Sequence, residues 1–380
     1  MKPLEPIGPY HYLRYVFHDL TRCMWVRTLN IGYKKIPKAI LIANFHGIGN
    51  MVLFTPVLQT LRAAYPSAAI TMIVANRGTK DVLLESGLIN ELIEYNVRTD
   101  SNRTRFRKIV SYLHDLGFSC SRNSMEPLFV FEANTTYRVG FSYNINFLRG
   151  VKFLLHHAAS HDLSKHEVLQ NLDLLKPLGI ETPVINPSFY FKEEDLSLAH
   201  QKIITRGITL GSPLIGFHAG SHGNLSKKRW PLENFAKLAD ALVERDNVQA
   251  VFVGDEKEKK DIHVIRSMMA HSAVNLAGLL SLKETAALIS TMALFVSNDS
   301  GPMHIAAGVG TPVVGIFGPT REAKNAPWPK AGVPAHVIRQ PMDCAPCYVS
   351  YSGDIECNTL ECLKALTPEM VFRACMETLD

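Results

Sequence analysis

The stretch that decides the fold is VSNDSGPMHIAAGVGTPVVGIFGPT, residues 296–320. An apolar strand ends at Asp299, a Ser-Gly turn follows, and Pro302 opens an apolar helix that leads into a second strand. A helix that begins at the end of a strand offers free N–H groups, and these donors and the helix dipole favour a negatively charged ligand. We therefore predict a diphosphate site at this helix start, although such helix caps also occur in purely structural settings. The predicted ligand contacts are Ser300, Gly301, Pro302, Met303 and His304, and Asp299 would bind sugar hydroxyls or fix the loop.

Strand and helix patterns alternate on both sides of this stretch. Short apolar runs that are typical of buried strands occur at residues 39–45, 68–76, 213–220 and 249–254, and a helical pattern follows each of them. Such alternation predicts the α/β class with parallel sheets.

The helical pattern after residues 39–45 has two alternative starts. The helix begins near Asn50 and kinks at Pro56, or it begins at Pro56 with Thr55 as its cap. Both are acceptable, because proline is well tolerated in the first turn of a helix and kinks a helix that continues through it.

A proline-rich segment, residues 176–191, divides the chain and holds three prolines among turn residues. At roughly 150 residues per domain, a chain of 380 residues also suggests two domains. We predict two doubly wound, Rossmann-like domains, at residues 38–185 and 186–380. If these domains face each other, the carboxyl ends of both sheets line one cleft, where ligands of such folds bind.

Composition places the chain among globular proteins, with 47% apolar and 20% charged residues. No apolar run approaches the roughly 18 to 20 residues that cross a bilayer, and His, Arg and Asp interrupt the apolar stretch near the N-terminus. We therefore expect neither a spanning helix nor a cleaved signal, and a cytoplasmic location.

The basic excess of the chain lies at its N-terminus. Residues 1–38 carry seven Lys or Arg residues and two acidic residues, so the whole net charge of +5 lies there. Apolar residues recur at helical spacing in the same segment, which predicts a basic amphipathic helix within residues 1–37. Such a helix lies on the anionic inner face of a membrane or packs on the body of the protein. Nucleic-acid binding is disfavoured, because basic and aromatic residues do not interleave elsewhere.

Four of the seven cysteines fall within a short loop, residues 344–362, with the spacing C-x2-C-x9-C-x4-C. Four thiolates at such a spacing can close a tetrahedral structural site for zinc or iron. The alternatives are reduced thiols packed as small apolar groups, or disulfides, which the missing signal sequence disfavours. The candidate metal ligands are Cys344, Cys347, Cys357 and Cys362.

Two long motifs, residues 296–320 and GFHAGSHGNLSKKRWPLENFAKLADAL at residues 216–242, resemble those of glycosyltransferase family 9. These are the bacterial ADP-heptose heptosyltransferases of lipopolysaccharide core synthesis. Residues 40–74 are similar to the family's opening strand, Gly loop and helix, and the resemblance extends from about residue 38 to the C-terminus. It implies the GT-B fold, with the nucleotide sugar held mainly by the second domain. It also implies a closing helix, about residues 368–379, that returns to the first domain.

The resemblance also assigns roles to residues of the second domain. The family's lysine before its aromatic-Trp-Pro motif matches Lys228, whose charge would offset the leaving diphosphate, whereas the alternative is a solvated Lys-Lys-Arg turn. The family's ribose-binding acidic residue matches Glu256, and Asp255 could substitute for it. Ser221 and His222 match the positions where the family contacts phosphate.

One position departs from the family pattern. The family's opening loop ends in Gly-Asp, and that Asp is the presumed general base, but this chain has Gly49 followed by Asn50. An amide cannot accept a proton at neutral pH. Asn50 therefore only orients the acceptor while His46 in the same loop, which also contains Gly47, acts as base. Alternatively His46 is structural, and the acceptor proton leaves late to water or phosphate.

The resemblance implies an inverting transferase that moves heptose from a nucleotide sugar, ADP-heptose by family likeness, to a lipopolysaccharide-core or other cell-envelope glycan. No Asp-x-Asp pair stands where a metal would chelate the diphosphate, so we expect catalysis without a metal cofactor. Two alternatives keep the same donor site. One is a transferase that acts on a protein or another acceptor, and the other is a non-catalytic protein that binds sugar nucleotides.

Overall fold

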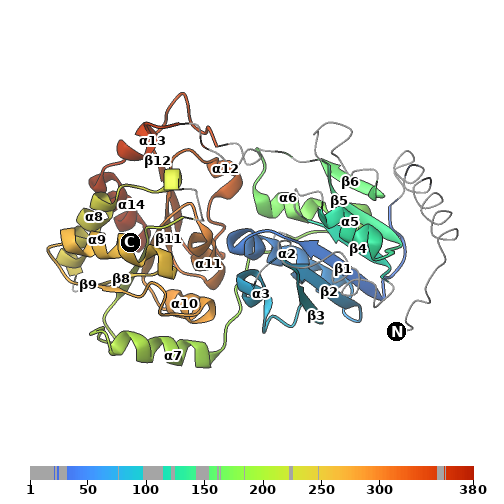
Figure 1. The fold of residues 1–380 in the computed structure, drawn as a ribbon, viewed down its shortest axis with the longest axis horizontal. Helices are drawn as coiled ribbons and strands as arrows, with labels where there is room; N and C mark the ends of the chain where they lie inside the picture. Colours follow the sequence, from blue (N-terminus) through green and yellow to red (C-terminus); the bar gives the residue numbers. More distant parts are fainter. Residues whose placement is uncertain are drawn as a thin grey trace. The chain divides into compact units, whose positions relative to one another are not determined.

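The structure is a computed structural model that describes residues 21, 24, 32–75, 77–96, 114–120, 125–142, 154–160, 162, 164–183, 185–221, 226–246, 248–348, 355 and 357–380. The chain forms two compact units, Met1–Ile185 and Asn186–Asp380 (Figure 1). Most of the amphipathic helix predicted at residues 1–37 lies outside the described residues. Within the described part of the chain, no helix is both long and apolar enough to cross a membrane.

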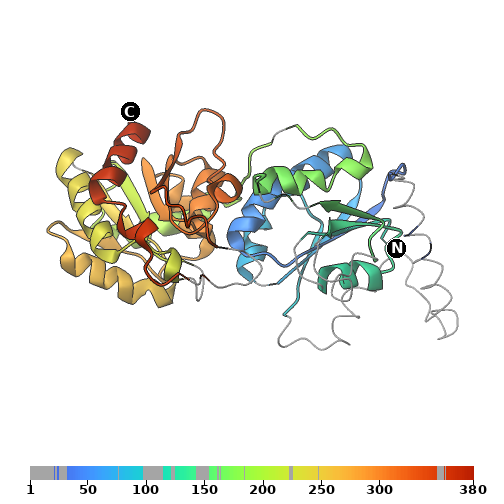
Figure 2. The same ribbon diagram turned by 90° about the horizontal axis from the view of Figure 1, so that it is seen from above.

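The first unit contains a parallel sheet with the strand order β3-β2-β1-β4-β5-β6. Helices α2 and α6 pack together on one face of this sheet, and α5 covers the other face (Figure 2). The strands are β1 (Ala39–Asn44), β2 (Ala69–Val74), β3 (Glu91–Glu94), β4 (Leu116–Ser119), β5 (Tyr137–Ser142) and β6 (His157–Ser160). The described helices are α2 (Ile48–Ala64), α3 (Arg77–Leu83), α5 (Met125–Glu132), α6 (Glu167–Asp173) and the 3₁₀ turn η2 (Lys176–Leu178).

The second unit repeats this topology, with the parallel order β12-β11-β10-β7-β8-β9. The strands are β7 (Leu214–His218), β8 (Gln249–Phe252), β9 (Ala273–Asn275), β10 (Leu294–Asn298), β11 (Val313–Phe317) and β12 (Ala335–Arg339). The α-helices are α7 (Glu193–Ile204), α8 (Leu232–Asp246), α9 (Lys259–Met268), α10 (Leu282–Ile289), α11 (Gly301–Val309), α12 (Glu322–Asn325), α13 (Glu361–Lys364) and α14 (Pro368–Leu379). Two short 3₁₀ turns, η3 (Ser226–Lys228) and η4 (Glu256–Glu258), follow β7 and β8. The predicted α/β class with two doubly wound sheets is confirmed.

Helix α2 settles the two alternatives for its start, because it begins at Ile48 and continues through Pro56. Pro56 has no N–H group, so the carbonyl of Val52, four residues earlier, loses its helical partner. The Thr55 hydroxyl replaces that partner and donates a hydrogen bond to the Val52 carbonyl at 2.7 Å. A buried side chain thus satisfies the group that proline leaves without a donor.

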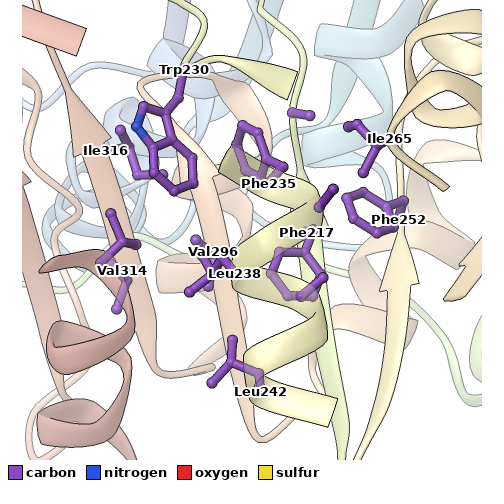
Figure 3. Close-up of a cluster of buried hydrophobic side chains, with 14 of the residues drawn as sticks. Phe217, Trp230, Phe235, Leu238, Leu242, Phe252, Ile265, Val296, Val314 and Ile316 are labelled. Atoms are coloured by element: carbon purple, nitrogen blue, oxygen red, sulfur yellow. The ribbon is translucent and has the colours of Figure 1, made fainter. Parts of the chain in front are cut away.

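The core of the second unit lies between α8 and the sheet (Figure 3). Trp230 is fully buried and packs edge-on against Phe235 of α8, with ring centroids 5.1 Å apart. Leu238 and Leu242 of α8 extend this contact over the sheet, where Phe217 of β7 lies beneath them. Burial of these rings fixes the loop that precedes α8, in which the predicted Lys228 lies.

Helix α14 packs within the second unit, and its predicted return to the first domain stays a prediction. It packs against α8 and against strands β10, β11 and β12 of the second unit. Its apolar face, with Val371, Ala374 and Cys375, belongs to the same buried cluster as Trp230. The helix is therefore part of the second unit's own core.

Candidate active site

The strand order reverses at one point in each sheet, between β1 and β4 and between β7 and β10. In parallel α/β sheets ligands bind beyond the carboxyl ends of the strands at such a switch point. In the second unit, β7 ends at His218 and β10 ends at Asn298. The predicted contacts Ser221 and Asp299–His304 follow these two strands directly. The topology thus brings together two motifs that lie about 80 residues apart.

Lys228 and Asp299 form a buried ion pair at this switch point. The Lys228 Nζ atom lies 2.9 Å from Asp299 Oδ2, and only 11% and 6% of the two side chains are exposed. Burial would raise the pKa of Asp299, but the adjacent Lys228 ammonium and, to a smaller extent, His304 lower that pKa below its ordinary value. Asp299 is therefore ionised, and Lys228 also lies over the Tyr348 ring, 5.4 Å from its centroid. This geometry excludes the solvated Lys-Lys-Arg turn as the setting of Lys228.

Asn298 joins the segments that carry these groups, and sequence reasoning missed it. Its Oδ1 atom accepts a hydrogen bond from the Trp230 backbone N–H at 3.0 Å. Its Nδ2 atom donates to the carbonyls of Ala219 at 2.8 Å and Gly220 at 3.2 Å. The side chain is completely buried, so one amide holds the end of β10, the loop after β7 and the loop of Lys228 in register. Asn298 directly precedes Asp299 in the sequence, but its side chain is uncharged, so no charge pattern marks it as a functional residue.

Helix α11 presents its N-terminus at the same point. Ser300 is its N-cap residue and Pro302 lies in its first turn, but the Ser300 side chain makes no capping hydrogen bond. The first N–H groups of the helix therefore have no side-chain cap. Met303 is fully buried, and a Cβ atom on Gly315 of β11 would lie 2.9 Å from its sulfur. The Met303 side chain therefore packs on the sheet and is not available to a ligand.

Glu256, the acidic residue predicted to bind ribose, is exposed, whereas its neighbour Glu258 is buried. The Glu256 side chain is 68% exposed and pairs with Lys259 at 3.2 Å. Glu258, two residues later, is buried and points toward the loop after β7, where its carboxylate fills the space beside Gly220 and Gly254. The inward carboxylate at this position is thus Glu258. The Asp255 side chain caps the η4 turn through the N–H groups of residues 257 and 258.

The other predicted donor contacts are only partly described. Ser221 is buried, and its hydroxyl accepts a hydrogen bond from Arg229 Nε at 3.1 Å. Arg229 in turn pairs with Asp261 of α9 at 2.8 Å. His222 lies outside the described residues.

The acceptor-side residues lie at the switch point of the first unit, in the loop between β1 and α2 and in the first turn of α2. Gly47 is the N-cap residue of α2, Gly49 and Asn50 lie in its first turn, and His46 precedes it. His46 and Asn50 are both partly exposed.

The buried carboxylate of Glu126 holds this loop and was not predicted. Its Oε1 atom accepts a hydrogen bond from the Phe45 backbone N–H at 2.5 Å. Asn44 accepts a second one from the His46 backbone N–H at 3.1 Å. Glu126 follows β4, whose neighbour in the sheet is β1, so only the parallel pairing brings it to this loop.

The four clustered cysteines lie beside the Lys228 loop. Burial raises the pKa of Cys362, and the nearby thiols of Cys347, Cys357 and Cys344 raise it further. The backbone N–H of Leu360 donates to Cys357 Sγ at 3.4 Å and lowers the pKa of that thiol. The sulfur atoms are thus neighbours, but no three His, Cys, Asp or Glu side chains in the described part of the chain are arranged to hold a metal ion. The metal site stays a prediction.

Comparison with known proteins agrees with this arrangement. The model of the family described as glycosyltransferase family 9 (heptosyltransferase) matches residues 106–352. The chain is 26% identical to lipooligosaccharide heptosyltransferase 2 of Haemophilus influenzae over 356 residues, which cover 90% of this chain and 99% of that protein.

Solved structures show the same fold. The glycosyltransferase family 9 protein from Veillonella parvula is 25% identical, with a TM-score of 0.76 over 90% of this chain and 97% of that one. The ADP-heptose LPS heptosyltransferase II of E. coli is 23% identical, with a TM-score of 0.70 over 90% of this chain and 98% of that one. The predicted GT-B type of fold is confirmed.

Proposed function

This chain belongs to glycosyltransferase family 9, the heptosyltransferase family, and we propose that it transfers a heptose from ADP-heptose, with inversion, to a hydroxyl of a lipopolysaccharide-core or other cell-envelope glycan. The observation that carries the proposal is the buried Lys228–Asp299 pair beside the uncapped N-terminus of α11. The Haemophilus relative is a lipooligosaccharide heptosyltransferase, which supports the heptose and the glycan acceptor.

The donor site supplies positive charge where the leaving group gains negative charge. Breaking the bond between heptose and phosphate leaves both electrons on the departing diphosphate. The Lys228 ammonium and the N–H groups of the first turn of α11, which the Ser300 side chain does not cap, are fixed before the reaction, so they stabilise that charge without reorganising. This supply of charge needs no divalent metal in the catalytic step.

The acceptor side must remove a proton from the attacking hydroxyl. Asn50 cannot accept it, so we assign that role to His46, whose loop the Glu126 carboxylate holds in place. Asn50 then orients the acceptor. Direct attack by the acceptor, with no protein nucleophile, inverts the anomeric centre.

A basic cavity on the first unit supports docking to an anionic membrane surface. Its volume is about 690 Å³, and Lys34, Lys35 and Lys176 contribute to its lining. It lies at the end of the first sheet where strands β1 and β6 begin, and the His46 loop follows the opposite end of β1.

Calorimetric titration with ADP, UDP and GDP tests the donor assignment, and transfer from ADP-heptose to heptose-deficient lipopolysaccharide tests the reaction. We expect selective ADP binding and turnover that Lys228→Met lowers by about 10²–10³-fold. Preference for UDP or GDP contradicts the donor. Binding without transfer to any glycan acceptor favours a different acceptor or a non-catalytic role.

A further inference from the structure

A chain of three buried polar side chains ends at the N-terminus of α11. His218 Nε2 lies 3.2 Å from Glu258 Oε2, and His218 Nδ1 lies 2.9 Å from Ser300 Oγ. The exposed fraction is 4% for His218, 9% for Glu258 and 8% for Ser300. They come from β7, from η4 and from the N-cap of α11, so only the folded sheet brings them together.

The backbone leaves room for this chain of contacts. A Cβ atom on Gly220 would overlap Glu258 Oε1, and one on Gly254 would lie 2.6 Å from Glu258 Oε2. The Asp255 backbone N–H donates to the same Oε2 atom at 2.9 Å and fixes the carboxylate. Burial would raise the pKa of Glu258, but the hydrogen bond from His218 and the other neighbours lower it. Glu258 is therefore an ionised acceptor, held against the imidazole.

The ionised carboxylate decides which hydrogens the imidazole carries. A carboxylate only accepts hydrogen bonds, so His218 Nε2 must carry a hydrogen. In the neutral imidazole Nδ1 is then an acceptor, and the single hydrogen of the Ser300 hydroxyl points inward to it. In the imidazolium Nδ1 is a donor to Ser300 Oγ, and the Ser300 hydrogen becomes available to another acceptor.

The second neighbour of Ser300 is only a long, 3.1 Å acceptor for that hydrogen. Ser297 donates its own hydrogen to the Asn298 carbonyl at 2.8 Å. Its oxygen, 3.1 Å from Ser300 Oγ, is therefore only an acceptor toward Ser300. Because Ser300 makes no capping bond to α11, its hydroxyl lies at the helix N-terminus without a fixed role there.

We propose that His218 is a positioning residue that takes up a proton when a diphosphate binds at the N-terminus of α11, and that this proton turns the Ser300 hydroxyl hydrogen toward the phosphate. The inference rests on the proposed donor site. Glu258 stabilises the imidazolium, and the phosphate gains a hydrogen bond that neutral His218 would withhold. Donor affinity is thus linked to pH through a residue that does not touch the donor.

Other charges near this chain act on it as well. Arg229, which pairs with Asp261, lowers the pKa of Glu258 through its charge. The Lys228–Asp299 pair lies on the other side of the Ser300 turn, and His304 lies in the first turn of α11. Among the described residues, His304 is the other imidazole at this helix start, so the experiment must separate it from His218.

Calorimetric titration with ADP-heptose, without acceptor, measures the linkage. The diphosphate of this donor carries no titratable proton near neutral pH, so protons taken up in buffers of different ionisation enthalpy report on the protein. Because one proton is taken up with each donor bound, we expect the affinity to fall about tenfold per pH unit toward the alkaline end of a series from about pH 6 to 8.5. His218→Gln should bind more weakly at low pH and show no such slope.

Three further variants and His304→Gln complete the test, with thermal melting to verify that each is folded. Glu258→Gln is nearly isosteric and should move the fall in affinity to lower pH. Ser300→Ala should lose at least half of the slope. His271→Asn, which removes a histidine that pairs with Asp240 on the same unit, should leave the slope unchanged.

The outcomes separate two kinds of failure. If the wild-type protein does not bind ADP-heptose at any pH, the proposed donor site is wrong. If it binds but takes up no proton, or if His218→Gln keeps the slope while His304→Gln loses it, the role of His218 is overturned. A full slope in Ser300→Ala shows that His218 acts by charge alone and contradicts the turning of Ser300.

Discussion

Replacing Lys228 by Met tests whether this residue serves catalysis or only the fold. The change keeps much of the side-chain length and removes the ammonium 2.9 Å from Asp299 Oδ2. Loss of one fixed donor at a developing charge lowers kcat by about 10²–10³-fold, which corresponds to roughly 2.7–4 kcal/mol of transition-state stabilisation. The same change leaves a buried carboxylate without its cation, and this destabilises a protein by about 3–5 kcal/mol.

The double variant Lys228→Met with Asp299→Asn separates these two effects. Removing both charges should return most of the lost unfolding free energy, because no unpaired charge remains buried. It should not return kcat, because the leaving group still lacks its positive partner. Lys259→Met is the matched control, because its partner Glu256 is exposed, and we expect a change in stability below about 1 kcal/mol and normal turnover.

The assays are urea unfolding and initial rates with saturating ADP-heptose and acceptor. A single variant whose kcat stays within about threefold of the wild-type value contradicts the catalytic role, since that factor is below 1 kcal/mol. A double variant that regains both stability and kcat shows that Lys228 acts only by neutralising Asp299.

Four other predictions address the base, acid stability, the cysteines and the membrane. His46→Gln should lower kcat by about 10²–10⁴-fold while ADP-heptose affinity stays unchanged, and an undiminished kcat would favour late proton loss. The pKa values of Asp299, Glu258 and Glu284 lie below their ordinary values, because their cationic and hydrogen-bonding partners outweigh burial. The stability that these carboxylates contribute is therefore present above about pH 4.5 and is lost as the pH falls through their folded-state pKa values. Urea unfolding between about pH 3 and 7 measures this loss, and Glu284→Gln, which breaks the pair with Lys202, should reduce its size. Elemental analysis should find about one zinc or iron per chain. The metal content should fall in Cys362→Ser but not in the control Cys120→Ser, which changes a buried cysteine outside the cluster. A stable metal-free protein would rule this site out. A chain without residues 1–30 should bind anionic vesicles less than the full chain does, and equal binding would contradict a membrane role for that segment.

The elements of the fold were predictable because parallel α/β units leave a strong local signal. Buried strands such as β7 (LIGFH) and β10 (LFVSN) begin as apolar runs, and a Gly or Asp follows within two residues of each end. The same signal placed Asp299 and Ser300 at a strand end and α11 directly after them. Lys228 was found through its motif, because its partner Asp299 lies 71 residues away.

The choice between Glu256 and Glu258 was not predictable from alternation or helical period. Both lie in one short 3₁₀ turn, where no periodicity marks the inward side. The spacing of Asp255 and Glu258 fits a capping box, a local signal that would have favoured Glu258 as the side chain that folds back. The His218–Ser300 contact spans 82 residues, so no local sequence pattern predicts it. Taken alone, His218 fits a strand and Ser300 fits a helix cap.

The place of α14 has a consequence for the order in which the protein is made. Trp230 Nε1 donates to the Leu366 carbonyl at 2.9 Å, and α14 then covers the same cluster. All strands of the first sheet have left the ribosome once residue 160 has emerged, whereas the core under the Lys228 loop closes only after residues 368–379 have followed. Because domains fold in the order of synthesis, the first unit can fold while the second unit still lacks α14. The proposed donor site therefore forms on a nascent chain only after α14 has been made.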